Sequence, residues 1–346
     1  MAETPTGLQR VLRHQLVWPV LALVVLLLVN VVAKPGFFDV RMQDGHLYGN
    51  LIDIVRNSAP VLLVALGMTL VIATRGIDLS VGAVAAISAA VVCTRIVGAG
   101  DEGALTTAVM ACTYALAVCV LLGAWNGFLV SVLGIQPIIA TLILMVAGRG
   151  IAQLLTGGQI ITVYYAPFFF LGNGFLFGLP FAVFIAAAVW GLLHLLMTRT
   201  ALGLFIQAIG INPAASRLAG LHERLITVCV YTFCGFAAGV AGLVISSNVK
   251  SADGNNAGML MELDAILAVT LGGTALTGGR FSLAGSVLGA LIIQTLTSTI
   301  YSIGVPPEIN MVVKAAVVFV VMLLQSSEFR AALRGWVVRP AAGSAG

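Results

Sequence analysis

Long apolar stretches follow one another along almost the whole chain, separated by short polar connections. A membrane-spanning helix needs about 20 apolar residues, because each residue adds about 1.5 Å of rise across a hydrocarbon core about 30 Å thick. The sequence therefore predicts an all-α, polytopic membrane bundle of about ten transmembrane helices. The predicted spans are residues 16–33, 51–73, 78–98, 104–132, 137–156, 180–198, 225–247, 262–278, 281–303 and 308–326.

Two of these spans differ in length from a simple crossing. The stretch 104–132 is long enough to tilt or to contain a break, whereas 262–278 is short and rich in glycine. Either is a candidate for a broken or re-entrant helix, a feature that transporters often contain.

The start of the third span echoes the start of the eighth. Asp78 opens one with an acidic residue, and Glu262 and Asp264 open the other. In the predicted topology the two starts face opposite sides of the membrane, as an inverted repeat would produce. Acidic residues also cap helix N-termini, so capping explains the echo as well as a duplication does.

The composition supports a membrane location. Of the 346 residues, 60% are hydrophobic and 9% are charged, whereas a soluble domain carries about 25% charged residues. The net charge of +4 comes without a dense basic run, which argues against a nucleic-acid partner. We expect the outer surface of this chain to face membrane lipid.

Positive charges in the short connections predict the orientation, because cytoplasmic loops are enriched in Lys and Arg. With the N-terminus inside, ten arginines fall on the cytoplasmic side and four basic residues fall outside. We therefore expect a cytoplasmic N-terminus over 1–15, a transmembrane domain over 16–326 and a cytoplasmic tail over 327–346. The ten are Arg10, Arg13, Arg75, Arg199, Arg217, Arg224, Arg280, Arg330, Arg334 and Arg339, against Lys34, Arg41, Arg95 and Lys250.

Several kinds of chemistry are missing from the sequence. None of the three lysines closes a G-x-x-x-x-G-K-[ST] nucleotide-binding loop, and the four histidines have no metal-ligand or catalytic-triad spacing. The five cysteines all lie within apolar stretches, which favours small apolar fillers over disulfides. We expect no enzymatic activity, no metal and no cofactor in this chain. Energy for any transport would come from a separate subunit.

The connection 199–224, on the predicted cytoplasmic side, is the most informative polar segment. Its pattern predicts a short helix ending near Ile209 and a second short helix with Pro213 in its first turn and Asn212 as its cap. Its small residues leave a surface without large side chains, on which a partner protein could dock, although an ordinary connector at the membrane interface would have a similar sequence. The candidate docking residues are Gly203, Ala208, Gly210, Asn212, Ala215, Arg217 and Gly220.

Three motifs in order resemble the permeases of the ribose/simple-sugar branch of ABC importers. They are the connection 200–223, the run Gly-Ile-Asp-Leu-Ser-Val-Gly at 76–82, and the segment 262–280, which contains Leu-Gly-Gly-Thr and Gly-Gly-Arg. The resemblance extends from about residue 44 to 326, with one departure at Arg75, where the family usually carries glycine. It implies alternating access in the bacterial inner membrane, with 199–224 coupling to an ABC ATP-binding subunit.

The same resemblance implies the other partners and the cargo. They are a second permease subunit, which the resemblance favours as non-identical to this chain, and a periplasmic sugar-binding protein. Further stretches, such as 140–150 and 252–258, are similar to the subfamily that transports galactofuranose. Ribose or another monosaccharide is the alternative substrate.

A neutral sugar would need hydrogen-bonding groups along its path. Unpaired polar groups in hydrocarbon cost a few kcal/mol, so such residues should face the bundle interior. For any one of them taken alone, helix–helix hydrogen bonding is the favoured explanation. The candidates are Asn57, Asn126, Gln136, Thr141, Gln153, Gln159 and Gln294.

Four charged residues are candidates for structural or gating roles: Asp78, Arg149, Glu262 and Asp264. Arg149 lies inside a predicted span between two glycines, where a charge costs about 2.5–3.5 kcal/mol on insertion scales. We expect it to pair with Glu262 or Asp264.

Two rival functions are less well supported by the sequence. A secondary carrier or channel would usually show a ladder of carboxylates or histidines in mid-span, which this sequence lacks. An intramembrane enzyme would show catalytic groups at fixed spacing, and none is found.

Overall fold

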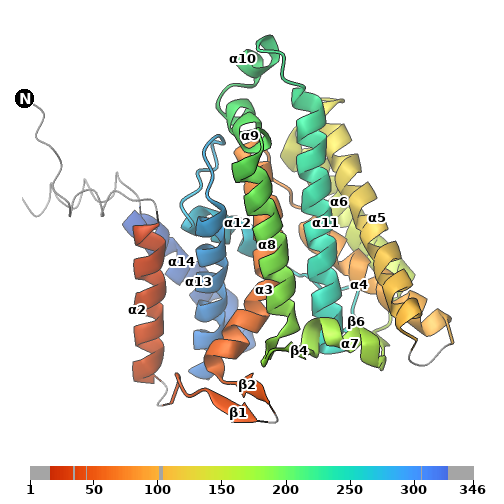
Figure 1. Ribbon diagram of the computed structural model, residues 1–346, viewed down its shortest axis with the longest axis vertical. Coiled ribbons are helices and arrows are strands. Elements are labelled where there is room, and N and C mark those ends of the chain that lie inside the picture. The colour runs from red at the N-terminus through yellow and green to blue at the C-terminus, as the bar shows by residue number, and fades with distance from the viewer. Residues whose placement is uncertain (1–15, 34–35, 44, 101–103, 305, 326–346) are drawn as a thin grey trace, which may run out of the picture.

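The computed structural model describes residues 16–325 except 34–35, 44, 101–103 and 305. The predicted cytoplasmic ends, 1–15 and 327–346, lie outside the described residues. The described part is a bundle of helices (Figure 1). The helices are α2 (Val17–Ala33), α3 (Asn50–Ala73), α4 (Val81–Gly98), α5 (Leu105–Ser131), α6 (Pro137–Leu155), α7 (Ala166–Asn173), α8 (Phe181–Arg199), α9 (Leu202–Ile211), α10 (Pro213–Leu218), α11 (Glu223–Val249), α12 (Met261–Leu271), α13 (Leu283–Ser302) and α14 (Pro307–Gln325).

Three short antiparallel strand pairs join connections at the end of the bundle opposite α9 and α10 (Figure 1). The pairs are β1 (Arg41–Gln43) with β2 (His46–Tyr48), β3 (Ile161–Thr162) with β6 (Ser251–Ala252), and β4 (Phe175–Leu176) with β5 (Leu179–Pro180). The β3–β6 pair ties the connection after α6 to the connection after α11. The sequence prediction contained no strands.

Helix α3 forms the centre of the core. Its residues from Val61 to Ala73 are all buried, and it packs against α8, α11, α12 and α13. A helix that is apolar on every side must be covered on every side. The outer helices α5, α6 and α8 instead expose large apolar side chains, as Leu121, Val146 and Leu192 show with exposures of 67–68%. Such a surface suits hydrocarbon.

Glycines at small-residue spacing on α11 let two other helices approach closely. A Cβ added at Gly235 would lie 2.5 Å from the Cys119 carbonyl oxygen of α5, and one added at Gly242 would lie 2.2 Å from the Ala85 oxygen of α4. These contacts are the close packing that small residues allow between membrane helices.

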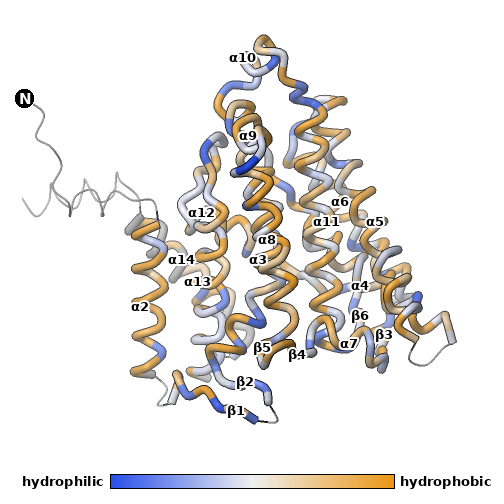
Figure 2. The backbone as a smooth tube through the Cα atoms, viewed as in Figure 1, coloured by the Kyte–Doolittle hydropathy of each residue, from blue (hydrophilic) through white to orange (hydrophobic). Residues whose placement is uncertain are grey.

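Seven of the described helices are long and apolar enough to cross a membrane: α3, α4, α5, α6, α8, α11 and α13. Figure 2 shows hydrophobic residues along these helices and hydrophilic stretches gathered in the connections near their ends. The chain is therefore a polytopic helical bundle. The count of about ten spans and the inverted repeat stay predictions.

The two spans of unusual length have different outcomes. The stretch 104–132 forms one continuous helix, α5, of 27 residues. The stretch 262–278 is broken, because α12 has 11 residues and ends at Leu271. The next helix, α13, begins only at Leu283. The glycines at 272, 273, 278 and 279 explain the break, since Gly is a poor helix former.

Candidate functional site

The helices α9 and α10 form a compact segment at one end of the bundle (Figure 1). Asn212 caps α10, because its side-chain oxygen accepts a hydrogen bond of 3.0 Å from the Ala215 amide, and Pro213 occupies the first turn. The predicted pair of helices is confirmed. Helix α9 runs two residues beyond the expected end at Ile209, because the Asn212 amide still bonds to the Ala208 oxygen.

Three segments meet where α9 joins the bundle. The Arg75 guanidinium, just past the end of α3, donates hydrogen bonds of 2.5 Å to the Gly210 and Ile211 oxygens. The Gly279 amide donates to the Ala73 oxygen at 2.9 Å. A Cβ on Gly210 would lie 1.9 Å from that same Ala73 oxygen, so only glycine fits there. Sequence reasoning placed Arg75 on this side but missed its contact with α9.

The candidate docking residues divide into two groups. Gly203 and Gly210 are buried against the bundle, and Ala208 is half-buried. The other four, Asn212, Ala215, Arg217 and Gly220, are exposed, and so is the apolar Leu218, at 92%. The first group attaches the segment and the second is free to meet a partner.

A buried polar cluster lies in the connection between α3 and α4. The Asp78 carboxylate accepts from the Ser80 amide at 2.9 Å and from the Ser80 hydroxyl at 2.6 Å. Asn126 of α5 donates to that hydroxyl at 2.9 Å, and Thr141 of α6 accepts from the Leu79 amide at 3.1 Å. Two of the predicted polar residues, Asn126 and Thr141, therefore hold this connection against neighbouring helices.

The starts of α4 and α12 abut inside the bundle. A Cβ on Gly82 would lie 2.4 Å from the Glu262 side-chain oxygen and 2.4 Å from the Gly258 carbonyl oxygen. Glu262 is 5% exposed. The two segments that echo each other in sequence are thus neighbours in space. Of these two crossings, only the one that contains α12 is interrupted, after Leu271, and broken helices line the cavities of transporters.

Arg149 binds backbone rather than a carboxylate. Its guanidinium donates to the Ala257 oxygen at 2.6 Å and the Asn255 oxygen at 3.3 Å. The expected pairing with Asp264 is wrong, because Asp264 pairs with Lys314 of α14 at 2.5 Å. Among the described residues no direct ion pair joins Arg149 to Glu262, although the two charges attract each other at longer range. The carbonyl groups of the connection before α12 point toward α6 and accept the hydrogen bonds of the guanidinium.

Asp253 shapes that connection. Its carboxylate accepts from the Asn255 amide at 2.8 Å, the Asn256 amide at 3.2 Å and the Asn256 side chain at 2.7 Å. Burial raises the pKa of Asp253, but these hydrogen bonds outweigh it and hold the pKa below its usual value. Gln153 of α6 donates to the Asn255 side chain at 2.6 Å, so this predicted residue also meets the connection.

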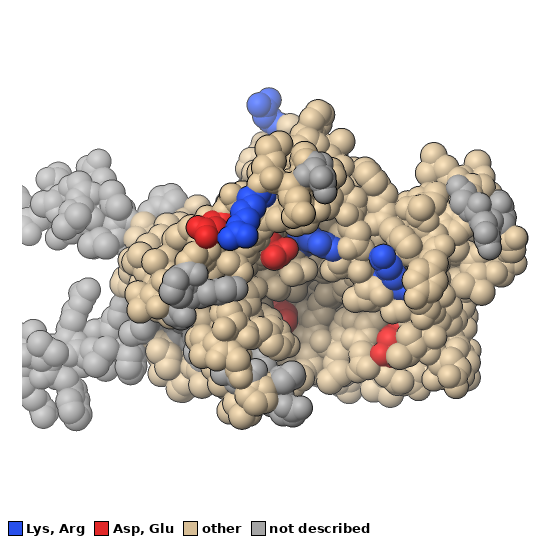
Figure 3. Space-filling view, turned by 90° about the horizontal axis from the view of Figure 1, so that it is seen from below, with Lys and Arg blue, Asp and Glu red and all other residues tan. Residues whose placement is uncertain are grey.

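The other predicted path residues are not brought to these clusters. Asn57 of α3, Gln136 at the start of α6 and Gln159 after α6 are exposed, and Gln294 of α13 is half-buried. Figure 3 shows the strand-bearing end of the molecule, which is hollowed near its middle between a few charged side chains. The polar clusters therefore form in the interior and at the ends of the bundle.

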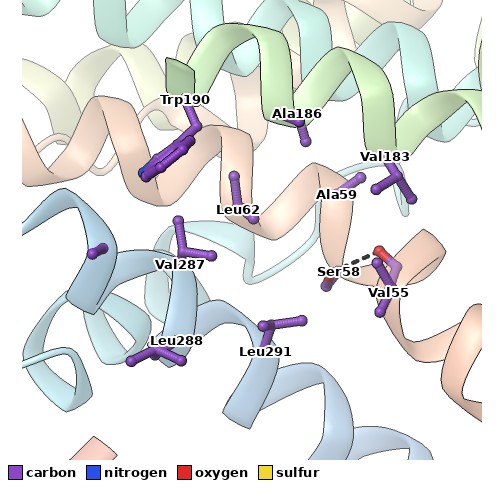
Figure 4. A pocket seen from close by; sticks show the side chains of 12 residues that line it. Val55, Ser58, Ala59, Leu62, Val183, Ala186, Trp190, Val287, Leu288 and Leu291 are labelled. Carbon is purple, nitrogen blue, oxygen red and sulfur yellow. Dashed lines mark hydrogen bonds between the residues drawn. The ribbon is translucent and has the colours of Figure 1, made fainter. Parts of the chain in front are cut away.

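One cavity is unsuited to a polar substrate. A space of about 460 Å³ between α3, α8 and α13 is lined by apolar side chains such as Leu62, Val183 and Leu291 (Figure 4). Its hydroxyl, Ser58, already donates to the Val55 oxygen at 2.7 Å. The indole N–H of Trp190, a buried donor without a partner among the described residues, also lines this cavity. Most hydroxyls of a sugar placed there would still lose their water partners, because the remaining lining is apolar.

Comparison with known proteins agrees with this arrangement. The family model described as branched-chain amino acid transport system / permease component matches residues 50–322. The galactofuranose transporter permease protein YtfT of Escherichia coli (strain K12) is 48% identical over 92% of this chain and 93% of its own length. The fructose import permease protein FruF of Bifidobacterium longum (strain NCC 2705) is 39% identical over 94% of this chain and 91% of its own.

The ribose import permease protein RbsC of Escherichia coli (strain K12) is more distant. It is 35% identical over 89% of this chain and 92% of its own length. No solved structure matches this chain. The family match covers most of the chain, and seven helices can cross a membrane. The chain is therefore a multi-pass membrane protein that belongs to this family of transport-system permease components.

Proposed function

We propose that this chain is a membrane-embedded subunit of an ATP-driven sugar importer in the bacterial inner membrane. The observation that carries the proposal is the α9–α10 segment, which is fixed to the bundle through Gly210 and Arg75 and exposes Leu218 beyond it. A separate ATP-binding subunit would push on such a segment. The sequence has no nucleotide-binding loop of its own.

The proposed substrate is a monosaccharide, and galactofuranose is the first choice. The relative named for galactofuranose is 48% identical, compared with 39% for the fructose permease and 35% for the ribose permease. Ribose or another monosaccharide is the alternative. All three relatives carry sugars in their names, which favours a neutral, hydroxyl-rich cargo over an ion.

The proposed assembly follows from the two ends of the bundle. The α9–α10 end faces the cytoplasm and the ATP-binding subunit, and the residues 199–224 form the coupling segment. The strand-bearing end faces the periplasm and a sugar-binding protein. A second, non-identical permease subunit covers part of the exposed apolar surface. Closure of the ATP-binding subunits then switches the bundle between outward and inward openings, as in alternating access.

Sugar uptake by cells that express the complete importer tests the proposal. Labelled galactofuranose should accumulate, and unlabelled galactofuranose should compete more strongly than ribose or fructose. Deleting this chain while keeping its partners should abolish uptake. Uptake that persists without the chain, or competition by none of the three sugars, would contradict the proposal.

A further inference from the structure

A second pocket, unlike the apolar cavity of Figure 4, opens between α12, α13 and α14. Its volume is about 500 Å³, within the usual range for a small-molecule site. Tyr301 lies near the end of α13, and Lys314 lies seven residues into α14, about 10 Å along that helix. The pocket therefore reaches from the strand-bearing end of the bundle toward its interior.

The polar wall of this pocket contains opposite charges. The Lys314 ammonium lies 2.5 Å from the Asp264 carboxylate, and the two side chains are 17% and 25% exposed. Thr297 donates its hydroxyl proton to the Ile293 oxygen at 2.9 Å, which leaves its oxygen able to accept. Tyr301 is 52% exposed and offers a ring face and a hydroxyl. Leu263 and Met311 supply the apolar wall.

These groups select the chemical class of a ligand. A free cation or anion would find the opposite charge already neutralised by its partner. A purely apolar molecule would leave the carboxylate and the ammonium without further hydrogen bonds. A neutral molecule with several hydroxyls can accept from Lys314 and donate to Asp264 and Thr297, and its apolar face can lie on Tyr301.

We propose that this pocket is a monosaccharide contact site on the translocation path. The inference rests on the proposed function, because it assumes that the importer carries a sugar. An ion pair used only for packing is often replaced by apolar side chains without loss of stability. The pair lines a pocket that extends to the end of α13, at the strand-bearing end where sugar would arrive, and this placement favours a role in contact with substrate.

Two threonines of α13 allow a matched test. Thr297 lines the pocket, whereas Thr295 is buried elsewhere, and each donates its hydroxyl to the carbonyl four residues earlier. In the complete importer with saturating binding protein, Thr297→Val should lower galactofuranose uptake about three- to tenfold, the effect of one lost hydrogen bond. Thr295→Val should leave uptake near wild type. Equal uptake by the two variants would overturn the proposal.

Thiol labelling tests whether sugar reaches the pocket. Met311 lines it, and Val312, the next residue of α14, does not. In a Cys229→Ser background, which removes the exposed native cysteine, Met311→Cys should react with a water-soluble thiol reagent, and galactofuranose with its binding protein should slow that reaction. Val312→Cys should show no such protection. A cysteine at 311 that does not react, or reacts equally with sugar, would also overturn the site.

The two proposals fail in different ways. If the unmodified importer takes up no galactofuranose, ribose or fructose, the proposed function is wrong. If it takes up sugar but Thr297→Val and Met311→Cys behave like the control variants Thr295→Val and Val312→Cys, the proposed function stands and the proposed sugar site is wrong.

Discussion

Replacing Arg75 with glycine should disconnect sugar uptake from ATP hydrolysis without unfolding the protein. Arg75 joins the end of α3 to the end of α9 through its two hydrogen bonds. It also adopts a left-handed backbone conformation, with φ of 65°. Glycine adopts that conformation without strain, so Arg75→Gly removes the link and relieves the backbone at the same time.

The expected energies nearly cancel in folding. A hydrogen bond from a charged donor contributes about 1.5–3 kcal/mol when shielded. The bond to Ile211 is exposed, so we take about 1 kcal/mol for each of the two. The left-handed conformation costs an L-residue about 1–2 kcal/mol. The free energy of unfolding should thus change by less than about 1 kcal/mol. The attachment of α9 to the end of α3 should weaken by about 2 kcal/mol, which lowers the ratio of attached to detached α9 roughly 30-fold.

Proteoliposomes that contain the complete importer allow both quantities to be measured in one sample. Arg75→Gly should retain ATP hydrolysis and its melting temperature, while sugar uptake per ATP falls at least tenfold. Arg75→Lys keeps the positive charge but loses the planar guanidinium that donates to two carbonyl oxygens at once, so its sugar uptake per ATP should be intermediate. Normal uptake per ATP in Arg75→Gly would refute the reasoning, and so would a large loss of thermal stability.

Three further predictions concern attachment, capping and charge. Gly210→Ala should lower the melting temperature, because its Cβ would meet the Ala73 oxygen at 1.9 Å, whereas Gly191→Ala on α8 meets nothing within 4 Å and should be neutral; equal melting would contradict the tight contact. Asn212→Ala should weaken binding of the ATP-binding subunit by about 1 kcal/mol through loss of the α10 cap, and Asn212→Asp should keep it; titration of the purified subunits decides. Asp264→Ala should destabilise the protein by about 2 kcal/mol or more by leaving Lys314 unpaired, and a second change, Lys314→Ala, should restore part of the loss; unaltered melting of the single variant would show that the pair has no structural weight.

The sequence predicts best the features that depend on local chemistry. The long apolar runs locate α3, α5, α11 and α13 closely, because hydrocarbon demands a fixed length of apolar helix. Asn212 followed by Pro213 predicts the start of α10, because a cap and a fixed φ act within one turn.

Features that depend on distant partners could not be predicted in the same way. The sequence predicts a carboxylate partner for Arg149, yet in the folded protein its guanidinium donates hydrogen bonds to carbonyl groups of residues more than a hundred positions away. Asp264 meets Lys314 only because α14 packs against α12. In the sequence, residue type alone identifies the candidates for a sugar path, so the set mixes Asn126, which holds a buried connection, with Gln136, which is exposed.

The central claim is that this chain moves sugar only when a separate ATP-driven subunit acts on α9 and α10. Uptake of galactofuranose into liposomes that hold both permease subunits, with the binding protein outside, measures it directly. Uptake should require the wild-type ATP-binding subunit and ATP, and a variant of that subunit unable to hydrolyse ATP should give none. Sugar accumulation at an undiminished rate with the ATP-binding subunit left out would contradict the account.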